Sequence, residues 1–451
     1  MASLSLLGHA PVDALSRLLQ REEPLPSTAD VIIIGGGIMG CSAAWYLAKA
    51  KMRVVLLDRS HIASHQSGRN WGFVRKLCRD PLEVPLAVEA LKLWPHLSEE
   101  LGFETGWRRS GCLFLSDSAA EQQSYSEWHR AVRDLVDDIR LLDSTETAEK
   151  LPQLKLKAHG AILAEQDGHA EPILATQAFA RAAAREGAIV LEECGAVRIT
   201  TSGGRVSGVE TEHGPIHATA VICAAGAQSY RLMAGLGLKL PQKTVRSTVA
   251  LTKPLPDLGL PCFVGCGLGL RQRPDGSCIL ATDAGTDIDI TLDSFRASRY
   301  FLGEILRNGK GFSLNLGAPF MEELGTRLSV PRAERAVRPR NPDVPANPQR
   351  TQTALRLFSD LFGSAITPEI EKSWAGQIDV LPDALPVIDA PVQIPGLVIA
   401  TGFSGHGFGL GPAVGSVLAQ LTRGSPPSVD LTAFAADRFV RGAYSRPYAT
   451  I

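Results

Sequence analysis

The apolar positions of residues 30–58 predict a strand, a helix and a second strand. Val31 to Ile34 form an unbroken β-branched run, which is typical of a parallel strand buried on both faces. The next apolar positions recur at helical spacing, at Ile38, Cys41, Trp45 and Ala48. A second apolar run, Val54 to Leu57, ends at Asp58. The order predicts a strand–helix–strand unit of a parallel sheet.

The rest of the pattern mixes both periods. We expect an amphipathic helix over 11–21, and further helices over 84–101, 119–138, 294–309 and 349–362. Strands are expected at 243–252 and 278–282, and a hairpin with a turn at His213-Gly214 leads into a buried strand that ends at Ala225-Gly226. Because a second glycine-terminated strand comes so late, the domain that begins at residue 29 is predicted to be discontinuous. The predicted division is an N-terminal extension (1–28), a first domain (29–78, 171–239 and 373–451) and a second domain (79–170 and 240–372).

Three glycines stand between the first strand and the helix. Gly35, Gly37 and Gly40 match G-x-G-x-x-G, in which the first allows a tight turn, the second lets backbone approach a pyrophosphate, and the third packs the helix on the strand. The helix N-terminus then stabilises phosphate. Asp58 lies 18 residues after Gly40, where a carboxylate accepts ribose hydroxyls and disfavours NADP. The unit predicts a dinucleotide site and leaves NAD and FAD open.

Charge and composition exclude several classes of protein. The 451 residues carry a formal net charge of −1, so no basic excess favours nucleic acid. Eight cysteines are scattered without a C-x-x-C pair, which argues against a disulfide scaffold or a metal site and favours a reducing compartment. The N-terminus lacks a basic signal-peptide region, and no apolar run approaches the roughly 18 residues of a membrane span. We therefore expect a cytoplasmic protein with no transmembrane segment.

A glycine cluster lies near the C-terminus, in the stretch "TGFSGHGFGLGPAV" at 401–414. Five glycines in one turn indicate that backbone approaches a ligand or repeatedly adopts positive φ. A polar, glycine-containing loop, "SHQSGRNWGFVR" at 64–75, is likewise too rich in side chains for a simple connector.

Six stretches together resemble the D-amino-acid oxidase-like FAD oxidoreductases, the group of sarcosine oxidases, glycine oxidase and D-amino-acid dehydrogenases. They are "VIIIGGGIMGCSAAWYLAK", "SGRNWGFVR", "GHAEPILATQAFARAAAREGA", "VICAAGAQS", "SWAGQIDVLPDALPVID" and "LVIATGFSGHGFGLGPAVG". The resemblance implies an α/β fold with a Rossmann-like FAD-binding domain, discontinuous in sequence, and a second α+β substrate domain on a mostly antiparallel sheet. It also implies that the glycine cluster lies beside the flavin and that the helix from about Pro412 points its N-terminus at the ring, where its dipole stabilises the anionic reduced flavin.

The cofactor-binding residues expected from the motif and the resemblance fall in seven places along the chain. They are Gly35, Gly37, Ile38, Met39, Gly40, Asp58 and Arg59; Ser67, Gly68, Arg69, Asn70, Trp71 and Gly72; Val197, Ala225 and Gly226; Gly376; and Gly402, Phe403, Ser404, Gly405, His406, Gly407, Phe408 and Gly409. Gly376 falls where sarcosine oxidases carry a flavin-linking cysteine, so we expect non-covalent FAD and no metal.

Four residues are the candidates for chemistry on the substrate. The imidazole of His406 could contact flavin or substrate; a flavin contact is favoured over a general base, because hydride transfer mainly requires a neutral, oriented amine. A substrate carboxylate calls for an arginine fork, and Arg75 and Arg271 are favoured over Arg246 and Arg273. Trp374 could form a pocket wall or an ordinary core contact.

The function expected is oxidation of an amino acid or related secondary amine to an imine, by hydride transfer to flavin N5 and then hydrolysis. The electron acceptor, oxygen or a quinone or protein carrier, stays open, as do the substrate's identity and stereochemistry, and a homo-oligomer is compatible with the sequence. One alternative is the flavoprotein subunit of a multi-component amino-acid or opine dehydrogenase. The other is a non-catalytic FAD-binding regulatory protein.

Overall fold

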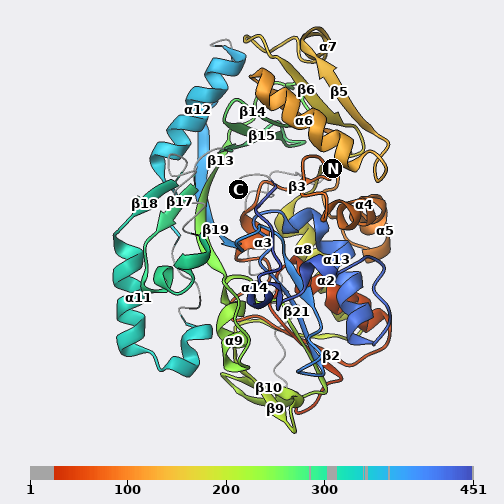
Figure 1. The fold of residues 1–451 in the computed structure, drawn as a ribbon, viewed down its shortest axis with the longest axis vertical. Helices are drawn as coiled ribbons and strands as arrows, with labels where there is room; N and C mark the ends of the chain where they lie inside the picture. The colour runs from red at the N-terminus through yellow and green to blue at the C-terminus, as the bar shows by residue number, and fades with distance from the viewer. Residues whose placement is uncertain are drawn as a thin grey trace.

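Two large β-sheets and the helices packed on them make up the fold (Figure 1). The computed structural model describes residues 25–283, 286–301, 312–338, 340, 344–363 and 366–448. The helix expected over 11–21, the end of the one expected over 294–309 and part of the proline-rich stretch 338–349 lie outside these residues. Within them, no helix is long and apolar enough to cross a membrane.

The first sheet is six-stranded, with the order β20-β21-β12-β1-β2-β8. All its pairs are parallel except β20–β21. The bounds are β1 Val31–Ile34, β2 Val54–Leu57, β8 Ile189–Leu191, β12 Ala220–Cys223, β20 Val387–Asp389 and β21 Leu397–Thr401. The predicted Rossmann-like, sequence-discontinuous sheet is confirmed.

Both faces of this sheet are covered, as the unbroken apolar run of β1 requires. Val31 and Ile33 point into a core shared with α2 (Ile38–Lys49), α8 (Pro172–Arg185) and α13 (Gly407–Thr422). Ile32 and Ile34 point into a second core on the opposite face. There a small antiparallel sheet, β9 (Ala196–Ser202), β10 (Arg205–Thr211) and β11 (Gly214–His217), supplies the cover.

The second sheet is larger and mostly antiparallel, as predicted. Its order is β18-β17-β13-β16-β15-β14-β4-β6-β5, and β19 pairs with β13 along the opposite side of that strand for most of its length. Only β14–β4 and β17–β18 are parallel. The bounds are β4 Cys112–Ser116, β5 Ile139–Asp143, β6 Gly160–Ala164, β13 Lys243–Thr252, β14 Cys262–Gly265, β15 Leu268–Gln272, β16 Cys278–Thr282, β17 Thr286–Asp289, β18 Phe312–Asn315 and β19 Ile370–Val380.

The remaining elements lie around and between the sheets. A two-stranded ribbon pairs β3 (Phe73–Val74), at the end of the polar loop at 64–75, with β7 (Gly168–His169). The helices are α3 Gln66–Arg69, α4 Val84–Leu93, η2 Trp94–His96, α5 Leu97–Leu101, α6 Ala119–Val132, α7 Ser144–Lys150, η3 Gly226–Gln228, α9 Ser229–Gly235, η4 Leu292–Phe295, α11 Ala318–Ser329, η6 Arg332–Ala336, α12 Pro348–Phe362, η7 Thr432–Phe434 and α14 Arg438–Arg441.

Several predicted bounds differ from the structure. The strands at 243–252 and 278–282 are confirmed, but the helix expected over 119–138 ends at Val132. Three aspartates follow it, and negative charge after a helix C-terminus is unfavourable. The domain boundary drawn between 372 and 373 falls inside β19, which pairs along β13 in the larger sheet.

The helix after the glycine cluster begins earlier than expected. α13 starts at Gly407 and contains Pro412 in its interior, so the start near Pro412 was wrong. Proline is favoured at the first helical position, which is why the sequence pointed there. In the structure the helix N-terminus instead lies within the glycine cluster itself, next to His406.

Candidate active site

The turn between β1 and α2 has no room for side chains at two of its glycines. Gly35 has φ +117°, and a Cβ there would lie 2.2 Å from the carbonyl oxygen of Ala224. A Cβ on Gly40 would lie 1.9 Å from the carbonyl oxygen of Gly35. Both contacts are with backbone, which cannot move aside cheaply. These glycines therefore set the close packing of strand, turn and helix.

Asp58 organises the same turn from the end of β2. Its Oδ2 accepts the backbone N–H of Gly36 at 2.6 Å, and its Oδ1 accepts that of Ser60 at 2.7 Å. Burial raises the pKa of Asp58, although these two bonds oppose the rise. The motif did not single out Gly36, because this residue contributes its backbone N–H, a donor that glycine shares with other residue types.

The surroundings of this turn fit the dinucleotide expected from the sequence. The first turn of α2 carries no acidic residue that would repel phosphate, and the side chain of Ser67 accepts the N–H of Ile38 at 2.9 Å. Buried polar atoms of Gln66 (Nε2) and Gln228 (Oε1) have no hydrogen-bond partner among the described residues, yet both residues line the cavity beside the turn. A helix N-terminus and unpaired amide groups suit a cofactor with phosphates and hydroxyls.

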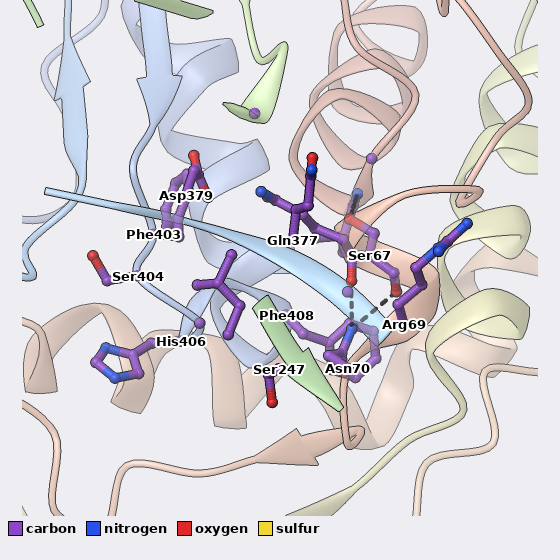
Figure 2. A pocket seen from close by; sticks show the side chains of 18 of the residues that line it. Ser67, Arg69, Asn70, Ser247, Gln377, Asp379, Phe403, Ser404, His406 and Phe408 are labelled. Atoms are coloured by element: carbon purple, nitrogen blue, oxygen red, sulfur yellow. Dashed lines mark hydrogen bonds between the residues drawn. The ribbon is translucent and has the colours of Figure 1, made fainter. Parts of the chain in front are cut away.

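The loop after β2 is held by its own side chains. Asn70 donates from Nδ2 to the carbonyl oxygens of Gln66 and Ser67, and its Oδ1 accepts the N–H of Gly72. Arg69 donates from Nη1 to the carbonyl of Ala375 in β19, at 3.0 Å. Figure 2 shows Ser67, Arg69 and Asn70 on one side of the cavity and Ser404 and His406 on the other. The loop is thus fixed both internally and to the larger sheet.

The glycine cluster is fixed by a buried carboxylate that sequence reasoning missed. Asp379 at the end of β19 accepts the N–H of Gly402 at 2.8 Å and the hydroxyl of Thr401 at 3.3 Å. Gln242 donates to the same carboxylate at 2.7 Å. Burial raises the pKa of Asp379 against these bonds. An aspartate between the apolar residues Ile378 and Val380 was the available signal for it.

A single cavity of about 1480 Å³ joins the two ends of the site. It exceeds the roughly 300–1,000 Å³ of pockets for drug-sized ligands, so it can hold a dinucleotide and a small molecule together. The expected site residues that line it are Gly35, Gly37, Ile38, Met39, Asp58, Arg59, Ser67, Arg69, Asn70, Trp71, Gly72, Arg75, Ala225, Gly226, Gly376, Phe403, Ser404, Gly405, His406, Gly407 and Phe408.

Seven expected residues do not line the cavity. They are Gly40, Gly68, Val197, Gly402, Gly409, Arg271 and Trp374. Gly68, like Gly40, packs against backbone: its Cβ would lie 2.0 Å from the carbonyl oxygen of Ala63. Ala196, next to Val197, lines the cavity instead. Trp374 donates from its indole nitrogen to the carbonyl of Arg69 and packs with Trp71, which does line the cavity.

The candidate arginines separate clearly. Arg271 is buried, 2.8 Å from Glu171, and Arg273 shares the same carboxylate at 3.3 Å. Arg246 pairs with Asp289 in the adjacent strand. Arg75 alone of the four lines the cavity; its guanidinium lies over the ring of Phe114, 5.2 Å from the centroid, and it donates to the carbonyl of Leu77.

The substrate-side wall holds residues that no motif indicated. Phe114 and Tyr125 meet edge to face, and Trp128 donates from its indole nitrogen to the carbonyl of Arg79 at 2.6 Å. Asp117 and Glu121 also line this end. These residues come from β4, α6 and the segment before α4, so only the tertiary fold brings them together.

His406 belongs to a buried polar cluster with Arg79 and Glu83. Its Nδ1 lies 3.4 Å from Oε2 of Glu83, and the same oxygen lies 3.7 Å from Nη1 of Arg79. Arg79 also donates from Nη2 to the carbonyl of His406 at 2.9 Å. Burial lowers the pKa of Arg79 to about 10, against the charge of Glu83. Arg79 and Glu83 were not predicted as site residues.

Known proteins similar to this chain share both the sequence pattern and the fold. Sarcosine oxidase subunit beta of Rhizobium meliloti is 26% identical over 92% of this chain and 89% of that protein. Mitochondrial sarcosine dehydrogenase of Mus musculus is 25% identical over 92% of this chain; the chain spans only 42% of its length. The solved structure of L-amino acid deaminase from Proteus myxofaciens, in complex with anthranilate, is 27% identical with a TM-score of 0.85, covering 93% of this chain and 95% of that one.

A family model described as FAD dependent oxidoreductase matches residues 30–421. The match runs from the strand before the glycine turn through α13 and so spans every part of the cavity described above. With the resemblance confirmed, the chain belongs to the FAD dependent oxidoreductases and is an enzyme that uses FAD.

Proposed function

We propose that this enzyme oxidises an amino acid or a related secondary amine to an imine, which water then hydrolyses. The observation that carries the proposal is the continuity of the cavity. One end presents the glycine turn and Asp58, and the other presents Arg75 and His406 within an aromatic wall. A cofactor held at the first end would thus share one continuous space with a substrate held at the second.

The chain's own residues would bind and orient both molecules. The turn at 35–40, Asp58 and the loop at 64–72 would hold FAD, which supplies a two-electron acceptor at its N5 atom when bound. Arg75 is placed to bind the substrate carboxylate, because it lines the cavity beside Phe114. The aromatic wall of Phe114, Tyr125 and Trp128 excludes water around the amine.

We propose further that FAD is held without a covalent bond. Gly376 of β19 lines the cavity, and its Cβ position lies 3.2 Å from the side chain of Arg69. A glycine offers no nucleophile at the position where the resemblance implies a linking cysteine. FAD would then leave the protein on denaturation, with no flavin fluorescence on the polypeptide.

A second candidate is a flavoprotein subunit of a multi-component amine dehydrogenase or oxidase. The similarity to a protein named sarcosine oxidase subunit beta, over 89% of its length, favours it. In that case the electrons pass to a partner protein rather than to oxygen, and a homo-oligomer alone would not turn over.

An anaerobic titration tests the proposal. Purified protein is mixed with D-, L-, cyclic and N-methyl amino acids while the flavin absorption near roughly 450 nm is followed. Bleaching by one class of amine supports the proposal, and readmitted air then separates an oxidase from a dehydrogenase. Bleaching without turnover with oxygen or dye supports the subunit reading. Bound flavin that no amine in the panel bleaches counts against amine oxidation.

A further inference from the structure

A buried carboxylate lies behind the cavity wall and does not itself line the cavity. Glu83, the N-cap residue of α4, is 0% exposed, and neither of its side-chain oxygens has a hydrogen-bond partner among the described residues. A carboxylate is costly to bury in this way unless nearby charges compensate. Its position therefore calls for an explanation beyond capping a helix, since its side chain does not cap α4.

Two side chains that do line the cavity face this carboxylate. Nδ1 of His406 is 3.4 Å from Oε2, and Nη1 of Arg79 is 3.7 Å from the same atom. Neither contact has hydrogen-bond geometry in the structure. Catalytic hydrogen bonds are often long before the substrate binds and tighten afterwards. The carboxylate thus faces one imidazole and one guanidinium.

The two ring nitrogens of His406 lie in different surroundings. Nδ1 is buried against Glu83, while the side chain keeps 21% of its surface exposed and the residue lines the cavity. The exposed part is therefore the side of the ring away from Nδ1, where Nε2 lies. The backbone of His406 is fixed as well, because Arg79 donates to its carbonyl and its own N–H donates to that of Phe403.

Glu83 is negatively charged at neutral pH. Burial by itself would raise the pKa of this carboxyl, but His406 beside it and the charges of Arg79 and Arg75 outweigh burial and lower the pKa. Asp80 also faces the cluster, and burial raises the pKa of Asp80. Asp167 is a further carboxylate close enough to act on Arg79. The ionised carboxylate of Glu83 can accept a hydrogen bond from an N–H group. It therefore favours the form of the His406 ring that carries hydrogen on Nδ1.

We infer that Glu83 is a positioning residue that holds hydrogen on Nδ1 of His406, so that Nε2 accepts a proton from the substrate ammonium group. The inference rests on the proposed amine oxidation. In this step one N–H bond of the ammonium breaks, a new N–H bond forms at Nε2, and the electron pair stays on the amine nitrogen. The resulting imidazolium is stabilised by the charge of Glu83, and the amine is then neutral, as hydride removal requires.

Two neighbouring groups at this end of the cavity, the Cys78 thiol and the Tyr125 hydroxyl, are poorer acceptors. Burial raises the pKa of the Cys78 thiol to about 12, so it stays protonated and cannot take the proton in its neutral form. Burial also raises the pKa of Tyr125, whose hydroxyl already donates to Glu121 at 3.0 Å. Among the described residues at this end of the cavity, His406 is the lining histidine with a carboxylate behind it; His61, which faces Glu192, lies three residues after Asp58 at the nucleotide end.

Steady-state kinetics with the amine found in the titration above tests the pH dependence. In the unsubstituted enzyme kcat/KM should rise with pH along a limb set by deprotonation of His406. Glu83→Gln should move that limb to lower pH and reduce the plateau about 10-fold or more, because a weaker base remains. His406→Asn should lose the limb and about 100-fold in rate. Glu83→Asp should recover part of the loss, and Asp287→Asn, a buried ion-paired carboxylate off the cavity, should leave the limb in place.

A readout without turnover separates this inference from the proposed function. In protein labelled with ¹⁵N-histidine, the His406 resonances are identified as those lost in His406→Asn. At pH values above the rise in kcat/KM, they should show hydrogen on Nδ1 and none on Nε2. Glu83→Gln should lose this preference. Hydrogen on Nε2 in the unsubstituted protein would overturn the inference, as would an unmoved limb in Glu83→Gln with normal FAD content. If Glu83→Gln does not fold, Glu83→Asp and the unsubstituted spectrum still decide. The expected spectrum together with no amine oxidation would instead reject the proposed function alone.

Discussion

The two ends of the cavity are built from different materials. At the nucleotide end, backbone does most of the work: glycines let carbonyls pack at contact distance, and Asp58 and Ser67 accept backbone N–H groups. At the substrate end, side chains from β4, α6 and the segment before α4 form the wall. Backbone geometry tolerates almost no substitution, whereas a wall of side chains can be changed one residue at a time. One fold can therefore keep its cofactor while its substrate varies.

The largest effect should come from adding a single methyl group at the nucleotide end. Gly40→Ala would place a Cβ 1.9 Å from the carbonyl oxygen of Gly35, which forces α2 away from the turn. We expect a loss of about 3 kcal/mol or more in FAD binding, roughly 100-fold. The flavin-to-protein absorbance ratio after gel filtration measures it. Gly235→Ala is the matched control, because a Cβ there meets nothing within 4 Å; equal flavin loss in both variants would contradict the comparison.

A smaller effect should distinguish two arginines at the substrate end. Arg75→Met should raise KM for an amino-acid substrate about 10- to 30-fold, because a charge-assisted pair to the carboxylate is lost, with FAD content unchanged. Arg271→Met should instead lower the free energy of unfolding by about 1–3 kcal/mol, because Glu171 keeps only Arg273 as its partner. Steady-state kinetics and chemical denaturation measure the two. A raised KM in Arg271→Met alone would reverse the assignment.

The smallest effect concerns the boundary between the ends, where Glu83 supports the glycine cluster. Its pKa is lowered on folding, so its contribution to stability is complete above the ordinary glutamate pKa and is lost as the pH falls through the folded-state value. The difference in free energy of unfolding between the unsubstituted protein and Glu83→Gln should therefore shrink as the pH falls below about 4.5. Denaturation at a series of pH values measures it, and a constant or growing difference would show that the carboxylate is not held ionised.

The nucleotide end could be predicted because its signals are local. A strand, three glycines, a helix and a terminal acid follow one another within about thirty residues. Arg75 and Arg271 looked equivalent in sequence, since only tertiary packing shows that Glu171 neutralises the second. Glu83 precedes an ordinary helix, and its partner lies 323 residues away at position 406. Pro412 misled because a helix-start signal was read at a residue that the helix in fact encloses.

The strand order of the parallel sheet also determines when, during chain synthesis, the sheet can be completed. β21 pairs with β12, whose residues are synthesised more than 170 positions earlier. The glycine cluster packs against α2, whose residues are synthesised more than 350 positions earlier. At a synthesis rate of roughly 5–20 residues per second, the edge of β12 stays unpaired for tens of seconds after this strand is made. The cofactor cannot rescue it, because the cavity has no far wall until residues 397–408 are made. FAD can therefore be captured only after these residues are made, and a chaperone that shields this edge would raise the yield of active enzyme.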